Sequence, residues 1–94
     1  MKKNILIYDD DEGILHLCRS ILGKFGFEVR TLSTCENILN DVESIQPQLI
    51  LMDLWIPEIG GEKAIEILKQ NVNTKQTPVL LFLPIQILKR LVKK

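Results

Sequence analysis

Cysteine is scarce in this chain of 94 residues, which contains only Cys18 and Cys35. Neither residue belongs to a C-x-x-C pair or to a cluster with metal-ligand spacing, so the sequence offers no zinc motif and no disulfide framework. Both cysteines lie in segments with periodic apolar residues. We expect two free thiols in a reducing compartment, and a disulfide between them is the less favoured alternative.

Long hydrophobic runs are missing as well. No stretch approaches the ~20 apolar residues that a membrane span needs, and the apolar run near the N-terminus is too short for a signal peptide. Twelve basic and twelve acidic residues cancel, so no net field attracts nucleic acid or an anionic membrane. The basic residues 88–94 are more typical of a solvated helix end than of a binding arm. We therefore expect a cytoplasmic protein with no direct nucleic-acid partner and no membrane contact.

Hydrophobic residues make up 46% of the chain, which is enough for one core and predicts a single domain over residues 1–94. Residues 4–8, 48–53 and 78–83 are continuous apolar runs, which are typical of buried parallel strands. Residues 28–32 alternate between apolar and polar, which indicates a strand nearer the sheet edge.

Helical periodicity fills the segments between these strands. A first helix over residues 14–25 is predicted to end at Gly26, which suits the left-handed position after a helix. A second helix is predicted to be capped by Ser33 or Thr34 and stopped by Pro47.

A third helix is expected around residues 64–68, after a loop in which Pro57 and the Gly60–Gly61 pair are the turn residues. A last helix is expected from Ile85 onwards. Strands and helices thus alternate along the whole chain. This order predicts an α/β fold with a doubly wound parallel sheet and right-handed helical crossovers.

Two of the predicted buried strands end in acidic residues. Asp9 and Asp10 follow the first strand, and Asp53 ends the strand at residues 48–53. In open α/β sheets, ligands bind outside the carboxyl ends of the strands, so we expect these three carboxylates to converge there. Such an oxygen-only, negative pocket suits Mg²⁺, and a carboxylate beside that ion is a competent nucleophile for phosphoryl transfer.

The alternative is that these acids only cap helices and face water. We favour it for Asp11 and Glu12, because both suit the first turn of a helix. For the other three acids it would require two separate strands to end in acid by chance.

The segments "ILIYDDDEGIL" and "LILMDLWIPEIGG" resemble the response-regulator receiver domain of two-component signalling, in the CheY-like superfamily with its flavodoxin-like fold. The resemblance runs in order over residues 4–82, including the D-x-x-x-P motif, the Gly pair and "TPVLLF". It implies that Asp53 is the phosphoacceptor, that Asp9 and Asp10 organise Mg²⁺ with Asp10 a direct ligand, and that Trp55 adds a backbone carbonyl. It also implies a signalling module rather than an enzyme, with a sensor histidine kinase or phosphotransfer protein as partner.

The resemblance breaks near the C-terminus. The family has Ser or Thr after its fourth strand and Lys-Pro after its fifth, where this chain has Leu83 and then Pro84 without a lysine. This indicates a truncated flavodoxin-like sheet, with one helix and one strand missing. The run "VLLFL" then becomes an exposed sheet edge, which invites a homodimer or a domain swap. Three alternatives stay open. The missing unit is a flexible segment left out of the given sequence, or it is a true deletion. In the third alternative, the chain is a degenerate receiver that no longer signals.

A second functional class is a non-phosphorylated pseudo-receiver that serves as a protein–protein docking domain. Each charge-assisted hydrogen bond to a phosphoryl oxygen contributes about 1.5–3 kcal/mol, so losing the lysine and the hydroxyl weakens the phosphorylated state. A hydrolase of the aspartyl-phosphate type is disfavoured, because Trp55 stands where a second acid is needed. His16, the only histidine, is expected on the helix surface and not as a phosphodonor.

Overall fold

The order of elements matches the alternation predicted from the sequence. The structure is a computed structural model that describes residues 3–56 and 59–82. Its elements are β1 (Asn4–Tyr8), α1 (Glu12–Lys24), β2 (Glu28–Leu32), α2 (Ile38–Ile45), β3 (Leu49–Asp53), α3 (Gly60–Lys69) and β4 (Val79–Phe82). All neighbouring strands pair in parallel, in the order β2-β1-β3-β4. The chain adds β2 on one side of β1 and β3 on the other, so the sheet is doubly wound, with its switch point between β1 and β3.

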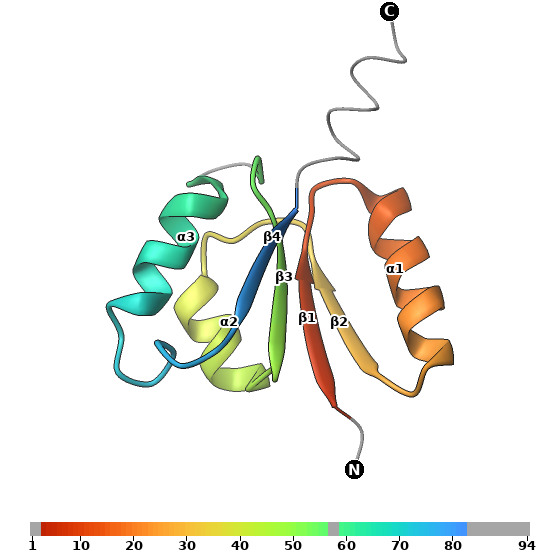
Figure 1. Ribbon diagram of the computed structural model, residues 1–94. Coiled ribbons are helices and arrows are strands. Elements are labelled where there is room, and N and C mark those ends of the chain that lie inside the picture. The colour runs from red at the N-terminus through yellow and green to blue at the C-terminus, as the bar shows by residue number, and fades with distance from the viewer. Residues whose placement is uncertain (1–2, 57–58, 83–94) are drawn as a thin grey trace, which may run out of the picture.

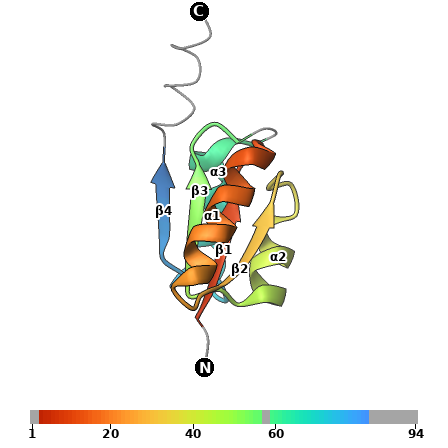
Figure 2. The same cartoon turned by 90° about the vertical axis from the view of Figure 1, so that its right-hand side faces the viewer.

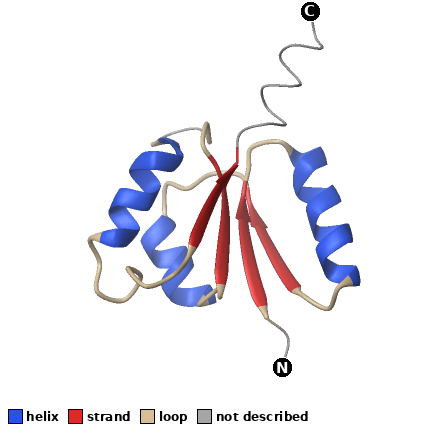
Figure 3. Cartoon of the chain, viewed as in Figure 1, coloured by secondary structure: helices blue, strands red, loops and turns tan. Residues whose placement is uncertain are grey.

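Helices cover the sheet on both faces, α1 on one and α2 with α3 on the other (Figure 1, Figure 3). Side chains alternate across β1, because successive residues of a strand point to opposite faces. Leu6 and Tyr8 join the core under α2 and α3, whereas Ile5 and Ile7 join the core under α1. The alternation explains why β1 is apolar at each position from Ile5 to Tyr8: both of its faces are buried.

Two predicted helix starts are wrong. The second helix begins at Ile38 with Asn37 in the N-cap position, and not at a Ser33 or Thr34 cap. The chain keeps an irregular course after β2 because Cys35 is fully buried in the core before the helix starts. Gly60 has a φ of +79°, as a turn residue requires, but the third helix does not wait until after the Gly pair, since α3 begins at Gly60. The predicted end of the first helix is confirmed, with Gly26 at a φ of +88°.

β4 is less covered than its sequence predicts for a buried strand. Leu80 is 58% exposed and Leu81 is 43% exposed, as the exposed-edge interpretation requires. The predicted last helix, together with Leu83, Pro84 and the turn residue Pro57, lies outside the described residues. Within residues 3–56 and 59–82, no helix is long and apolar enough to cross a bilayer.

Candidate functional site

Three carboxylates meet at the carboxyl end of the sheet, beside its switch point. β1 and β3 are neighbours with Tyr8 opposite Met52, so the acids that follow these residues emerge side by side. Asp9, Asp10 and Asp53 each contribute one carboxylate oxygen to the cluster, and these three oxygens lie within 4.8 Å of one another. Asp9 and Asp53 are fully buried and Asp10 is exposed, so the cluster reaches solvent on the side of Asp10.

Hydrogen bonds hold Asp9 in place from both sides. Its backbone N–H donates to the carbonyl oxygen of Leu32 over 3.1 Å, which ties the end of β1 to the end of β2. Its Oδ1 accepts the backbone N–H of Asp11 over 2.8 Å. Asp11 is not part of the cluster; its Oδ1 accepts the N–H of Ile14 over 3.0 Å and caps α1. The interpretation of Asp11 as a helix cap is therefore confirmed.

The turn after β3 orients Asp53. Its Oδ1 accepts the backbone N–H of Trp55 over 3.1 Å, and its carbonyl oxygen accepts the N–H of Ile56, also over 3.1 Å. The Trp55 side chain is 41% exposed. The backbone of Trp55 thus belongs to the same turn as the Asp53 carboxylate, while part of its indole is open to solvent.

Gly61 allows α3 to approach this turn closely. Its N–H donates to the carbonyl oxygen of Leu54 over 2.9 Å. A Cβ at this position would lie 2.9 Å from the carbonyl oxygen of Asp53 and 2.9 Å from the Cα of Leu54. Only glycine fits here without displacing the backbone that carries Asp53, a role that the sequence pattern did not reveal.

The donor chemistry of the cluster fits a small, hard cation. Three carboxylates in so small a volume repel one another unless positive charge is near, and oxygen ligands of this kind are those that Mg²⁺ takes in proteins. Burial, and after it the charge of Asp9, raise the pKa of the Cys18 thiol in α1 above its usual value. No disulfide joins Cys18 to Cys35, as expected.

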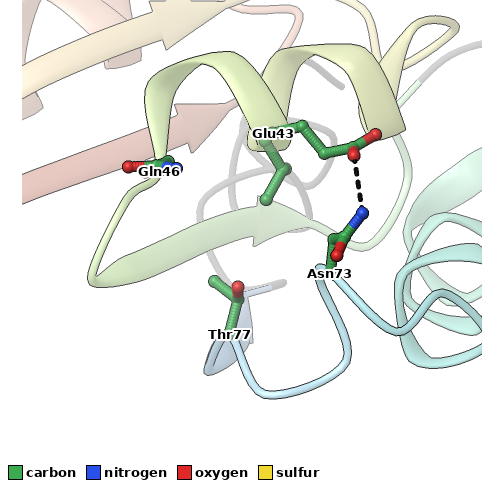
Figure 4. A pocket seen from close by; sticks show the side chains of 5 residues that line it. Glu43, Gln46, Asn73 and Thr77 are labelled. Atoms are coloured by element: carbon green, nitrogen blue, oxygen red, sulfur yellow. Dashed lines mark hydrogen bonds between the residues drawn. The ribbon is translucent and has the colours of Figure 1, made fainter.

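A hollow lies at the end of the sheet opposite the carboxylate cluster, where β3 and β4 begin. It has a volume of about 380 Å³ and is lined by Val42, Glu43, Gln46, Asn73 and Thr77 (Figure 4). The Asn73 side-chain amide donates to the Glu43 carboxylate over 3.1 Å at its rim. This hydrogen bond joins α2 to the loop before β4.

Residues 5–83 match the family described as the response regulator receiver domain. The chain belongs to this family. The receiver is 39% identical over 70 residues to the alkaline phosphatase synthesis transcriptional regulatory protein PhoP of Bacillus subtilis, covering 74% of this chain and 28% of PhoP. It is 33% identical over 81 residues to the polar-differentiation response regulator DivK of Brucella ovis, covering 85% of this chain and 65% of DivK. The chain therefore spans less than two thirds of the length of these relatives.

Solved structures show the same fold. The N-terminal domain of a response regulator receiver protein from Methanoculleus marisnigri JR1 superposes with a TM-score of 0.79 at 27% identity, covering 83% of this chain and 63% of that one. The chemotaxis response regulator CheY4 of Vibrio cholerae gives a TM-score of 0.80 at 19% identity, covering 99% of this chain and 98% of that one. The predicted flavodoxin-like receiver fold is thus confirmed.

Each residue predicted to form the site is accounted for in the described part of the chain. The structure brings Asp9, Asp10 and Asp53 together, and it sets Trp55 in the turn that orients Asp53. His16 is exposed on α1, as expected for a surface residue. Tyr8 packs in the core, and the hydrogen bond that its hydroxyl donates to the Asp41 carboxylate over 2.8 Å was not predicted from the sequence.

Proposed function

We propose that this receiver accepts a phosphoryl group on Asp53 from a histidine kinase or a phosphotransfer protein, in a reaction that requires Mg²⁺. The convergence of three carboxylates within 4.8 Å at the switch point supports this most directly. Asp11, which does cap a helix, is not part of the cluster.

Asp9, Asp10 and Asp53 would hold the ion, and the Trp55 carbonyl would add a further oxygen. When bound, Mg²⁺ would offset the repulsion among the carboxylates and the charge of the phosphoryl oxygens. The Trp55 N–H holds one oxygen of Asp53 and so orients the carboxylate for in-line attack. A carboxylate oxygen of Asp53 then forms the new bond to phosphorus while the bond to the donor's histidine nitrogen breaks. The departing imidazole keeps its electron pair and takes a proton from water.

Magnesium binding can be measured without any phosphoryl transfer. Trp55 is the only tryptophan, and its backbone bonds to Asp53, so its fluorescence reports on the site. We expect a saturable change in emission on titration with Mg²⁺. Asp10→Asn should abolish this change. Asp11→Ser, which keeps an N-cap oxygen but removes a neighbouring charge, should leave it intact.

Phosphorylation is tested by intact-mass spectrometry after incubation with acetyl phosphate and Mg²⁺. We expect the added mass of one phosphoryl group, located at Asp53 by peptide mapping. Asp53→Asn should gain nothing, and Asp11→Ser should gain as much as the unmodified chain. No gain by a folded chain that still binds Mg²⁺ would refute phosphoacceptor activity, and would favour the pseudo-receiver that acts as a docking domain.

The chain would serve as a signalling module in the cytoplasm, and not as an enzyme that releases a product. Residues 1–94 would act as one domain in this role. The chain lacks a lysine before Pro84 and a hydroxyl at Leu83, so we expect the phosphorylated state to be held by fewer charge-assisted hydrogen bonds. The lifetime of the aspartyl phosphate, followed by the same mass measurement over time, should be correspondingly short.

A further inference from the structure

The outer edge of β4 has the features of a pairing surface. The two edge strands of the described sheet differ in their side chains: β2 exposes the charged residues Glu28 and Arg30, whereas β4 consists of Val, Leu, Leu and Phe. Charges on an edge strand oppose pairing with another chain, and a flat apolar edge invites it. Figure 2 shows β4 at the sheet edge, clear of α1.

Backbone geometry identifies which groups of β4 point outward. The carbonyl oxygens of Pro78 and Phe82 accept N–H groups of β3, from Ile50 over 3.0 Å and from Leu54 over 3.2 Å. Backbone groups alternate in direction along a strand, so those of Leu80 also face β3. The N–H and C=O groups of Val79 and Leu81 therefore face away from the sheet.

We propose that a second copy of this chain pairs with β4 in an antiparallel arrangement about a twofold axis at Leu80. In this register Val79 of each copy lies opposite Leu81 of the other, and each opposed pair exchanges two hydrogen bonds. All four outward groups of each strand are then satisfied. The two sheets become one continuous sheet of eight strands, and the isologous contact closes without forming a filament.

The same register brings the two Leu80 side chains together. Val79 packs in the core under α2 and α3, so Leu80, the next residue, points to the opposite face, on the side of α1. Leu80 is 58% exposed and would lie at a non-hydrogen-bonded position, where opposed Cα atoms are about 4.5 Å apart. Pairing would cover the most exposed apolar side chain of the strand.

The choice of a second copy over another partner rests on this self-complementarity. An edge of four residues fits its own copy with every outward group paired, and no charge on β4 opposes the approach. The contact is limited to one strand of four residues from each copy, so we expect a weak dimer that depends on concentration.

Sedimentation velocity of the 94-residue chain over a wide concentration series tests the pairing. We expect a monomer–dimer equilibrium that Leu80→Lys shifts to monomer. Leu17→Lys is the matched control, because Leu17 is 54% exposed but lies on α1, and this variant should still dimerise. Leu81→Pro removes an outward N–H without removing a bond to β3, and should also give monomers.

Crosslinking tests the register. In a chain with Cys18→Ser and Cys35→Ala, Leu80→Cys should form a disulfide-linked dimer, because opposed Cα atoms at about 4.5 Å permit a disulfide. Leu81→Cys should not, since each Leu81 lies opposite Val79 of the other copy. A monomer at every concentration would overturn the proposal, as would a dimer that is insensitive to Leu80→Lys or a crosslink at Leu81 only. A monomer with slowly exchanging amides at Val79 and Leu81 would instead assign the edge to residues 83–94 of the same chain.

Discussion

Gly61→Ala should destabilise the receiver, although alanine is the better helix former. The added Cβ would lie 2.9 Å from the Cα of Leu54, about 0.6 Å short of the ~3.5 Å at which carbon atoms make optimal contact. It would also lie 2.9 Å from the carbonyl oxygen of Asp53. Both neighbours are backbone atoms at the end of β3, so they cannot rotate away as a flexible side chain could.

The cost follows from overpacking. Inserting a methyl group into a well-packed contact costs about 1–3 kcal/mol, and the helix preference for alanine offsets about 0.5–1 kcal/mol of this at most. We expect a net loss of about 1–2 kcal/mol in the free energy of unfolding. The displaced backbone carries Asp53, so the yield of aspartyl phosphate should also fall.

Gly23→Ala is the matched control for this prediction. Gly23 lies in α1, and nothing is within 4 Å of a Cβ built there. This variant should therefore be more stable than the unmodified chain by about 0.5–1 kcal/mol. Urea titrations followed by circular dichroism measure both variants. A Gly61→Ala midpoint equal to or above that of the unmodified chain would refute the close-contact argument.

Two further predictions concern hydrogen bonds near the site. Burial, and then the hydrogen bond to Asp41, raise the pKa of Tyr8 well above its usual value. The folded chain therefore favours the protonated Tyr8 hydroxyl, and the stability that this hydroxyl contributes is present below about pH 10 and lost as the pH rises further. Tyr8→Phe should be about 1 kcal/mol less stable at neutral pH and should lose less stability above pH 10, and urea titrations with parallel pH profiles would contradict this assignment. Asp11→Ala should lower the free energy of unfolding by about 1 kcal/mol, because the N-cap of α1 is lost, whereas Asp11→Ser should keep most of this stability. Equal losses for the two variants in thermal or urea unfolding would show that the cap does not stabilise the chain.

Much of the fold could be predicted because its elements have clear local signals. The bounds of β1 and β2 agree residue for residue with the apolar run at 4–8 and the alternating run at 28–32. The first helix ends where Gly26 permits a left-handed residue. Acids that follow two parallel strands must emerge at the same edge of a sheet, so the meeting of Asp9, Asp10 and Asp53 could also be predicted.

Other features could not be predicted from local pattern. Ser33 and Thr34 are good capping residues, but the burial of Cys35 delays the start of α2 to Ile38. The apolar residues of β4 indicated a buried strand, yet burial depends on which elements lie beside it, and Leu80 and Leu81 are exposed.

The sequence by itself determined the α/β order, the parallel sheet and the acids at its carboxyl edge, because apolar periodicity and strand direction are local or topological properties. Only the tertiary structure decided that Gly61 must be glycine, that Tyr8 bonds to Asp41, and that β4 turns Val79 and Leu81 outward. These features depend on distances between segments far apart in the chain, which no local pattern encodes. They are also the features that set how rigidly Asp53 is held and which surface the receiver offers to a second copy.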